Sequence, residues 1–325
     1  MPRVTVICGG VGAARFLRGL VQVVDPTDIT AIVNVGDDSV LHGLEVSPDL
    51  DTITYTLAGA IDPERGWGLV DESWQAMEQV RRYATANGIG ADDEIGNDAA
   101  GWFSLGDRDL GTHLYRTSRR RAGASLSQVT AEITAAWGLD LTVLPVSDDP
   151  LRTQLTTTDG RRLAFQEYFV REQHSVEVRS VEIVGASAAR PAPGVLAAIE
   201  QADAVVVAPS NPVVSIDPVL AVPGVRAALV AARERAVAVS PIVGGAALKG
   251  PADRLLRELG HEASVTAIAR WYATSCATLV IDDVDAALAD DVTAEGVRCV
   301  VAPTIMSGPA ESAALARRCL TEVGV

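Results

Sequence analysis

Four aspartates stand close together early in the chain, and they are the clearest sign of chemistry in it. Asp37 and Asp38 follow a glycine, and Asp49 and Asp51 lie within 47–52. Clustered carboxylates repel one another unless a cation lies among them, and Mg²⁺ takes carboxylate and phosphate oxygens. We expect Mg²⁺ here, with Asp37 and Asp51 as ligands. Taken singly, the first pair also fits a solvated turn, and Asp49 or Asp51 fits a helix N-cap.

A glycine-rich turn precedes these aspartates. Gly9, Gly10 and Gly12 follow the apolar run 3–8 and open an amphipathic stretch at 13–24. Glycines let the backbone turn tightly and let a phosphate approach the amides at a helix N-terminus. The pattern resembles a dinucleotide-binding fingerprint with Arg15 in place of the last glycine. A plain strand-to-helix turn remains the alternative.

A third segment, 105–113, carries both charges. Arg108 can grip a carboxylate or phosphate or stack on a ring, and His113 lies four residues after Asp109, on the same helical face. The alternative is a surface helix, capped by Asp107 or Asp109 and running to about residue 121. On that helix four further arginines are expected on a solvated face or at a subunit contact: Arg116, Arg119, Arg120 and Arg121.

Polar loops follow two later apolar runs. Ser210, Asn211 and Pro212 come after 204–208 and suit a base or a ribose. Ser240 follows 236–239, and Lys249 comes soon after it, within reach of a phosphate. Ordinary loop punctuation explains both segments equally well.

The elements that must position these residues alternate between apolar and amphipathic. This alternation predicts an α/β fold: a Rossmann-like, largely parallel sheet with helices on both faces. Strands are expected at 3–8, 29–35, 141–145, 204–208, 236–239, 278–281 and 298–302, and helices at 13–24, 72–85, 128–137, 195–201, 252–258 and 310–322. Residues 1–325 are expected to form a single domain.

Two regions depart from the alternation. Apolar runs at 153–157 and 162–170 flank Asp159-Gly160, which predicts a β-hairpin, and 176–184 is a further strand candidate. An antiparallel addition is therefore expected over 152–185. The stretch 86–100 is rich in Gly, Asn and Asp and is expected to be a flexible surface insertion.

Composition limits the possible partners. The 325 residues carry a net charge of −15, which argues against duplex nucleic acid. No run of ~20 apolar residues is present, so no membrane span is expected. The four cysteines are scattered, which indicates neither disulfides nor a zinc site. A cytoplasmic protein is expected.

Together these segments resemble the 2-phospho-L-lactate transferase family of coenzyme F420 biosynthesis. They occur in the family's order over nearly the whole chain. The forms at 12–17 and 66–68 look most like the actinobacterial branch, whose members act as phosphoenolpyruvate transferases. The matching segments are Gly9-Gly10-Val11-Gly12, Asn34-Val35-Gly36-Asp37-Asp38, Ser47-Pro48-Asp49-Leu50-Asp51-Thr52, Arg65-Gly66-Trp67-Gly68, Leu105-Gly106-Asp107-Arg108-Asp109 with Thr112-His113, Phe165-Gln166-Glu167, Ala208-Pro209-Ser210-Asn211-Pro212 and Ser240-Pro241-Ile242.

The resemblance implies a reaction. The terminal ribityl hydroxyl of the deazaflavin Fo attacks the phosphorus of a GMP-linked diphosphate donor that carries phosphoenolpyruvate or 2-phospho-L-lactate, and GMP leaves. It also implies a Mg²⁺ requirement and a homodimer. Asp51 and Arg108 match the family's deazaflavin-binding positions, and 9–12 and 210–212 match segments that line the guanine-nucleotide (GDP or GMP) cleft.

Two other functions are compatible with the glycine turn. One is a non-catalytic regulator of the gluconeogenesis-factor type that binds nucleotide sugars, for which 47–52 and 105–109 would be unnecessary. The other is an NAD(P)-dependent dehydrogenase, which Arg15 at the third fingerprint position disfavours.

Overall fold

The computed structural model describes residues 2–89 and 102–325, to which all structural statements below refer. The insertion expected at 86–100 falls mostly outside them. Of that stretch, Ala86 ends a helix and 87–89 form a hydrogen-bonded turn.

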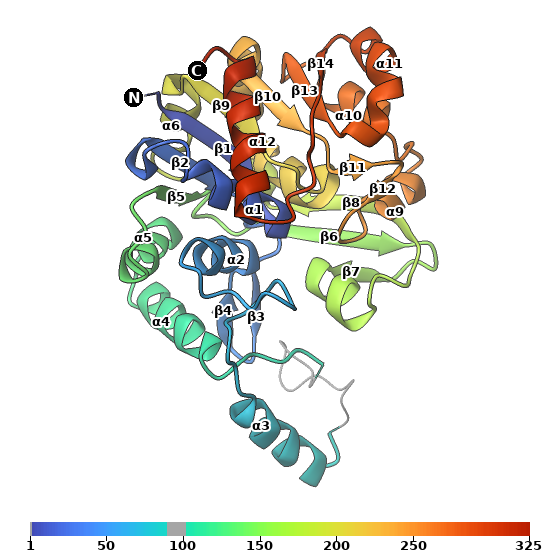
Figure 1. Cartoon of the computed structure of the whole chain (residues 1–325). Coiled ribbons are helices and arrows are strands. Elements are labelled where there is room, and N and C mark those ends of the chain that lie inside the picture. The colour runs from blue at the N-terminus through green and yellow to red at the C-terminus, as the bar shows by residue number, and fades with distance from the viewer. Residues whose placement is uncertain (1, 90–101) are drawn as a thin grey trace.

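A parallel sheet of seven strands forms the centre of the molecule (Figure 1). Its order is β14-β13-β10-β9-β1-β2-β5, so the order changes direction between β1 and β9. Open α/β sheets bind ligands at such a switch point, outside the carboxyl ends of the strands. The strands are β1 (Val4–Cys8), β2 (Ile29–Val33), β5 (Thr142–Pro145), β9 (Ala204–Val207), β10 (Ala236–Val239), β13 (Thr278–Ile281) and β14 (Arg298–Val301).

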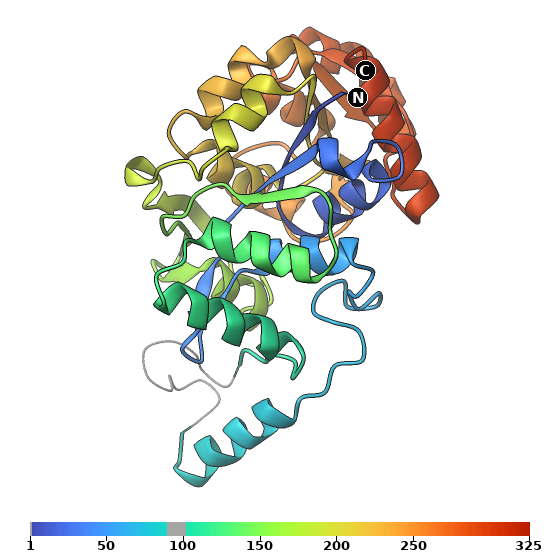
Figure 2. The same cartoon turned by 90° about the vertical axis from the view of Figure 1, so that its left-hand side faces the viewer.

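Helices cover both faces of this sheet (Figures 1 and 2). On one face α1 and α12 approach so closely that a Cβ on Gly19 would overlap the backbone at Ser312. On the other face α6 packs against α8. The helices are α1 (Gly10–Leu20), α2 (Pro48–Leu57), α3 (Gln75–Ala86), α4 (Asp109–Arg121), α5 (Leu126–Ala136), α6 (Val195–Gln201), α7 (Asp217–Leu220), α8 (Val225–Ala231), α9 (Ala252–Glu258), α10 (Val265–Tyr272), α11 (Ala289–Ala294) and α12 (Pro309–Glu322).

The sheet forms where the apolar runs predicted it. All residues of β1, β9, β10 and β13 are buried, as expected for strands covered on both faces. The predicted fold class is therefore confirmed, with strand ends that differ by one or two residues. Ser125 caps α5 in a complete capping box with Gln128.

The antiparallel addition is confirmed, with one correction. Strands β6 (Arg152–Thr157), β7 (Arg162–Ala164) and β8 (Val178–Val184) form a sheet of order β7-β6-β8. The run expected to be a strand to residue 170 leaves the sheet after Ala164, and Glu167–Arg171 form a π-helical turn. In this turn Phe165 stacks on Phe169, and Tyr168 is buried in the core.

Two short hairpins complete the fold. One is formed by β3 (Ser39–Leu41) and β4 (Leu44–Val46), and the other by β11 (Ile242–Val243) and β12 (Ala246–Ala247). The first packs with α3 in a small second core, whose buried members are Leu41, Val46, Met77 and Leu105.

A carboxylate from the segment before each of α3 and α4 binds the N-terminal amides of the other helix. The Asp107 carboxylate accepts hydrogen bonds from the amides of Gln75 and Ala76 at the start of α3. The Glu72 carboxylate accepts from the amides of Arg108 and Asp109 at the start of α4. The prediction that Asp107 or Asp109 caps α4 was therefore wrong. The capping carboxylate comes from a segment far away in the sequence.

No single helix among residues 2–89 and 102–325 is long and apolar enough to cross a membrane. One bent pair, Pro212–Leu220 with Val225–Ala231, meets the length and composition limits together.

Candidate active site

Two predicted binding segments meet at the switch point of the sheet: the glycine turn 9–12, and the polar loop 210–212, called the base shelf below. Gly9 follows β1 and Ser210 follows β9, and the Ser210 hydroxyl donates a hydrogen bond to the Gly9 carbonyl at 2.8 Å. A Cβ on Gly12 would overlap the Pro209 carbonyl, and Gly10 has φ +73°. Glycine is therefore required where the start of α1 passes this shelf, and the Gly10 amide there lies within hydrogen-bonding range of the Asp49 carboxylate.

Asn34 and Asp49 close the floor of the site beside Gly9. The Asn34 amide donates to Asp49 Oδ2 at 2.9 Å, and its carbonyl accepts from the Gly36 amide at 2.7 Å. Asn34 is fully buried, so its partners hold Asp49 in place. A Cβ on Gly9 would lie 2.7 Å from Asp49 Oδ2, so only glycine leaves that carboxylate room. Burial raises the pKa of Asp49 to about 6.

Asp37 and Asp38 lie in the same buried pocket without sufficient partners. Burial, followed by the charges of Asp49 and Asp38, raises the pKa of Asp37 well above its usual range. Burial likewise raises the pKa of Asp38, although the Ser47 hydroxyl donates to its Oδ2 at 2.8 Å. The Oδ1 atoms of both carboxylates are buried with no hydrogen-bond partner among the described residues.

The oxygens without a partner show whether these residues could bind a divalent cation. Buried carboxylates need a counter-charge, and the free Oδ1 atoms of Asp37 and Asp38 are hard oxygen donors of the kind Mg²⁺ prefers. Within the described residues, no group of three or more His, Cys, Asp or Glu side chains could hold a metal by itself. Mg²⁺ is commonly held by one or two carboxylates together with phosphate oxygens and water. The donor set therefore fits Mg²⁺ bound jointly with a phosphate ligand.

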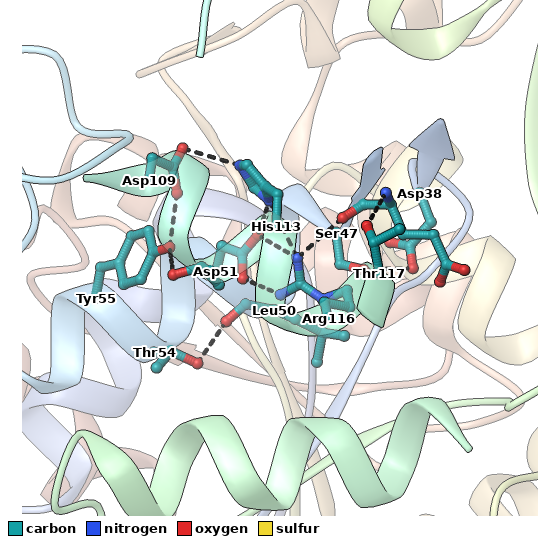
Figure 3. Close-up of polar contacts among 12 residues, drawn as sticks. Asp38, Ser47, Leu50, Asp51, Thr54, Tyr55, Asp109, His113, Arg116 and Thr117 are labelled. Carbon is teal, nitrogen blue, oxygen red and sulfur yellow. Dashed lines mark hydrogen bonds and ion pairs between the residues drawn. The ribbon is translucent and has the colours of Figure 1, made fainter. Parts of the chain in front are cut away.

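Asp51 is occupied differently, as Figure 3 shows. Its two carboxylate oxygens accept from the two terminal nitrogens of Arg116, one of them at 3.2 Å. Arg116 is only 2 % exposed, and Asp51 is 5 % exposed. The prediction that Arg116 lies on a solvated face or at a subunit contact was therefore wrong. Asp51 does not cap α2 either, because the helix starts at Pro48 and Asp51 lies inside its first turn.

His113 extends this pair toward the start of α4. Its Nδ1 lies 3.2 Å from Arg116 Nη1, and its Nε2 lies 3.2 Å from Asp109 Oδ2. Because an arginine nitrogen can only donate, Nδ1 accepts in this contact. Nε2 is close to Asp109 but is buried without a hydrogen bond of acceptable geometry among the described residues. The Tyr55 hydroxyl donates to Asp109 Oδ1 at 2.6 Å. Burial raises the pKa of Asp109, but the contacts with His113 and Tyr55 and the charge of Arg116 together outweigh it, and the net shift is downward.

The structure gives the remaining predicted residues contacts of their own. Exposed Arg108 donates from Nη1 to the Val70 carbonyl. Lys249 and Val11 both lie near Gly66. An ideal Cβ on Gly66 would be 3.5 Å from the Lys249 ammonium and 3.9 Å from a methyl of Val11, which belongs to the glycine turn. Ser240 is buried, and its hydroxyl donates to the Ile242 carbonyl and accepts from the Ile242 amide within its own turn.

The Asn211 side chain both supports the shelf and leaves a free donor. Its carbonyl accepts from the amides of Val213 and Val214 and so starts the π-helical turn Pro212–Ile216. Its Nδ2 is buried without a partner among the described residues. The base shelf therefore ends in an available hydrogen-bond donor.

A cavity of about 380 Å³ lies elsewhere. It opens at the amino ends of β1, β2 and β5 and is lined by residues such as Thr5, Thr30 and Ala198. None of the four aspartates at 37–51 lines it. We assign the site by its chemistry and its position at the carboxyl ends of the strands.

Comparison with known families decides what this constellation belongs to. The model of the 2-phospho-L-lactate transferase family matches residues 4–303. The chain belongs to this family. The match includes the glycine turn, all four aspartates, α4 and both polar loops. The alternatives of a nucleotide-sugar-binding regulator and a dehydrogenase are not favoured.

Proteins named phosphoenolpyruvate transferase resemble the chain over nearly its whole length. The phosphoenolpyruvate transferase of Streptomyces griseus is 46 % identical over 322 residues, covering 98 % of this chain and 97 % of that protein. Those of Nocardia farcinica and Mycobacterium avium are each 42 % identical and cover at least 99 % of this chain and 96 % and 99 % of their own sequences.

A solved structure shares the fold. A protein of the UPF0052 family from Bacillus halodurans superposes with a TM-score of 0.61 at 19 % identity, covering 98 % of each chain. At this identity the likeness supports the architecture only.

Sequence reasoning missed three residues that shape the site of this family member. Asn34 was quoted only as part of a motif, Thr153 as part of a hairpin, and Arg116 as a surface arginine. The Thr153 amide donates to the Gly36 carbonyl at 2.6 Å and brings β6 against the end of β2. A signal for Arg116 existed, because it lies three residues after His113 on the same helical face.

Proposed function

We propose that the protein transfers a phosphoenolpyruvate moiety from a GMP-linked diphosphate donor to the ribityl hydroxyl of Fo, releasing GMP, in coenzyme F420 biosynthesis. The observation that carries the proposal is that Asp37 and Asp38 each have one buried oxygen without a partner among the described residues, near a glycine turn at the sheet's switch point. The names of the most similar relatives support phosphoenolpyruvate over 2-phospho-L-lactate as the transferred group.

The donor's diphosphate fits the glycine turn. Amides at the start of α1 would bind its oxygens, and Lys249 would add a positive charge from the opposite side. Asn211 Nδ2 is a free donor for the base or ribose. These groups hold the reacting phosphorus in place, which supplies much of the catalysis in phosphoryl transfer.

Mg²⁺ would be held by Asp37 and Asp38, with the earlier assignment of Asp51 as its second ligand kept as the alternative. When bound, the ion neutralises charge on the diphosphate as a Lewis acid. Asp38 replaces Asp51 in this proposal because its Oδ1 is free, whereas Arg116 engages both oxygens of Asp51.

The acceptor would approach from the side of α4. Arg108 would contact the deazaflavin, and Asp51 would accept a hydrogen bond from the attacking hydroxyl. An alcohol is a far weaker acid than any carboxylic acid, so Asp51 orients the hydroxyl and receives its proton late. The proposal includes a cytoplasmic homodimer, as the family resemblance implies.

Product analysis with competing donors tests this function. Purified protein is incubated with Fo, Mg²⁺ and equal amounts of GMP-linked enolpyruvate, lactate and glycerate donors, and GMP and product masses are measured. We expect GMP release and a product mass dominated by the enolpyruvate form. Asp140→Asn, on an exposed residue, is the matched control for Asp37→Asn. Binding of a nucleotide sugar without any GMP release would instead support the regulator.

A further inference from the structure

Arg116 has a position that a purely structural residue would not need. It lies on α4, buried against α2, and its guanidinium spans both oxygens of Asp51. Replacing a buried ion pair with apolar residues is often neutral or stabilising, so such a pair is weak evidence for a role in stability. A bidentate guanidinium does, however, fix the direction of a carboxylate.

The groups around Arg116 fix the guanidinium in turn. His113 Nδ1 accepts from its Nη1 at 3.2 Å, and the Glu45 carbonyl lies 3.4 Å from the same nitrogen. Thr117, the next residue, accepts a hydrogen bond from the Glu45 amide at 2.8 Å. Arg116 is therefore held from the helix and from β4 at once, so that it can hold Asp51 rigidly.

The charge of Arg116 also reaches the unpaired carboxylates. Asp38 lies within electrostatic range of both partners: Arg116 lowers its pKa and Asp51 raises it. Because Arg116 neutralises Asp51, three carboxylates rather than four remain to be balanced by a cation. They are those of Asp37, Asp38 and Asp49. The pair thus separates a carboxylate with an internal counter-charge from those that require an external one.

We propose that Arg116 is a positioning residue for the transfer reaction: it holds Asp51 in the direction needed to orient the acceptor hydroxyl. This inference rests on the proposed function. Arg108 is the N-cap of α4, the helix that carries His113 and Arg116, so this one segment holds both the proposed acceptor contact and the clamp on Asp51. Loss of the clamp should lower kcat and leave the KM for the donor nearly unchanged.

The experiment compares Arg116→Met and Arg116→Lys, each alone and combined with Asp51→Asn, with Arg119→Met as control. Arg119 is on the same helix but pairs with Glu132 at the surface, so its loss should leave kcat unchanged. We expect Arg116→Met to lower kcat roughly 10- to 100-fold, the size of effect seen when a residue that orients a metal-binding side chain, without itself binding the metal, is replaced. Arg116→Lys should recover part of the loss, because it keeps the charge but not the fork.

The combination with Asp51→Asn separates positioning from folding. If Arg116 acts through Asp51, Arg116→Met costs no further activity once Asp51 is replaced. Losses that multiply, or single variants with wild-type kcat, would overturn the inference. Arg116→Lys carries the same comparison if Arg116→Met does not fold. A wild-type protein that releases no GMP is a different result, because it refutes the proposed function and this inference with it.

Discussion

Two groups of buried aspartates lie close together and differ in whether the protein itself supplies partners for their carboxylate oxygens. Asp51 and Asp109 are paired with Arg116 and His113, which lie on the same face of α4 (Figure 3). Asp37 and Asp38, at the end of β2, each keep one buried oxygen without a partner among the described residues. The first group contains its own counter-charge, the Arg116 guanidinium, and the second does not.

This difference assigns the two groups different tasks. A paired carboxylate is held in one direction and in one charge state, which suits the orientation of a hydroxyl. An unpaired buried carboxylate costs stability until a cation arrives, which suits joint binding of Mg²⁺ and a diphosphate. Substitutions in the two groups should therefore change stability in opposite directions, although both lower activity.

The largest effect is expected for Asp51→Asn. Loss of the oriented carboxylate should lower kcat by ~10²–10³. Because Arg116 then loses its buried counter-charge, the free energy of unfolding should also fall, by about 3 kcal/mol. GMP release and denaturant titration measure the two effects. A kcat equal to that of wild type would remove Asp51 from the mechanism.

Asp37→Asn should separate activity from stability. We expect kcat to fall ~10²-fold, because one ligand of the proposed Mg²⁺ is lost. In metal-free buffer the free energy of unfolding of the variant should be about 1 kcal/mol higher than that of wild type, because a neutral amide replaces a buried carboxylate that neighbouring carboxylates repel. Asp140→Asn is the control for both measurements. Destabilisation by Asp37→Asn would show that Asp37 is internally compensated.

The pH dependence of stability should reveal Asp49. Its pKa rises from 3.8 to about 6 because burial disfavours the charged form, so the folded chain binds this proton more tightly than the unfolded chain. The resulting stability is fully present below about pH 4 and is lost as the pH rises through 6. Without metal, wild-type stability relative to Asp49→Asn should fall by roughly 2–3 kcal/mol between pH 4 and 7. Equal slopes for the two proteins would contradict the assignment.

The smallest effect serves as a reference outside both groups. Ser125→Ala removes the capping box of α5 and should cost about 1 kcal/mol of unfolding free energy, with kcat unchanged. Thermal unfolding and GMP release check it. A parallel loss of kcat would mean that activity follows global stability, and the opposite signs expected for the two aspartate groups would lose their meaning.

The fold was predictable because its signals are local. Runs such as Ala204–Val207 are fully apolar and buried on both faces of the sheet, so composition alone marks them as strands. The strand predicted beyond Ala164 failed because an apolar run also suits a buried turn, and Tyr168 fills the core from a π-helical turn instead.

The candidate site was predictable only in part because its decisive contacts are long-range. The aspartates and glycines stand out by spacing, but Asp51 lies 65 residues from Arg116, and Glu72 lies 36 residues from the amide of Arg108 that it caps. The local spacing places Arg116 on the same helical face as His113, but it does not show that this face is buried. Only the packing of α4 against α2 shows which one is used.

The most direct test of the account is a calorimetric titration of Mg²⁺ into the protein with and without GDP, for wild type, Asp37→Asn and Asp38→Asn. We predict that GDP strengthens Mg²⁺ binding in wild type and that either substitution removes this cooperation. Cooperative binding of Mg²⁺ and GDP that survives in both variants would contradict the claim that the unpaired carboxylates hold the ion.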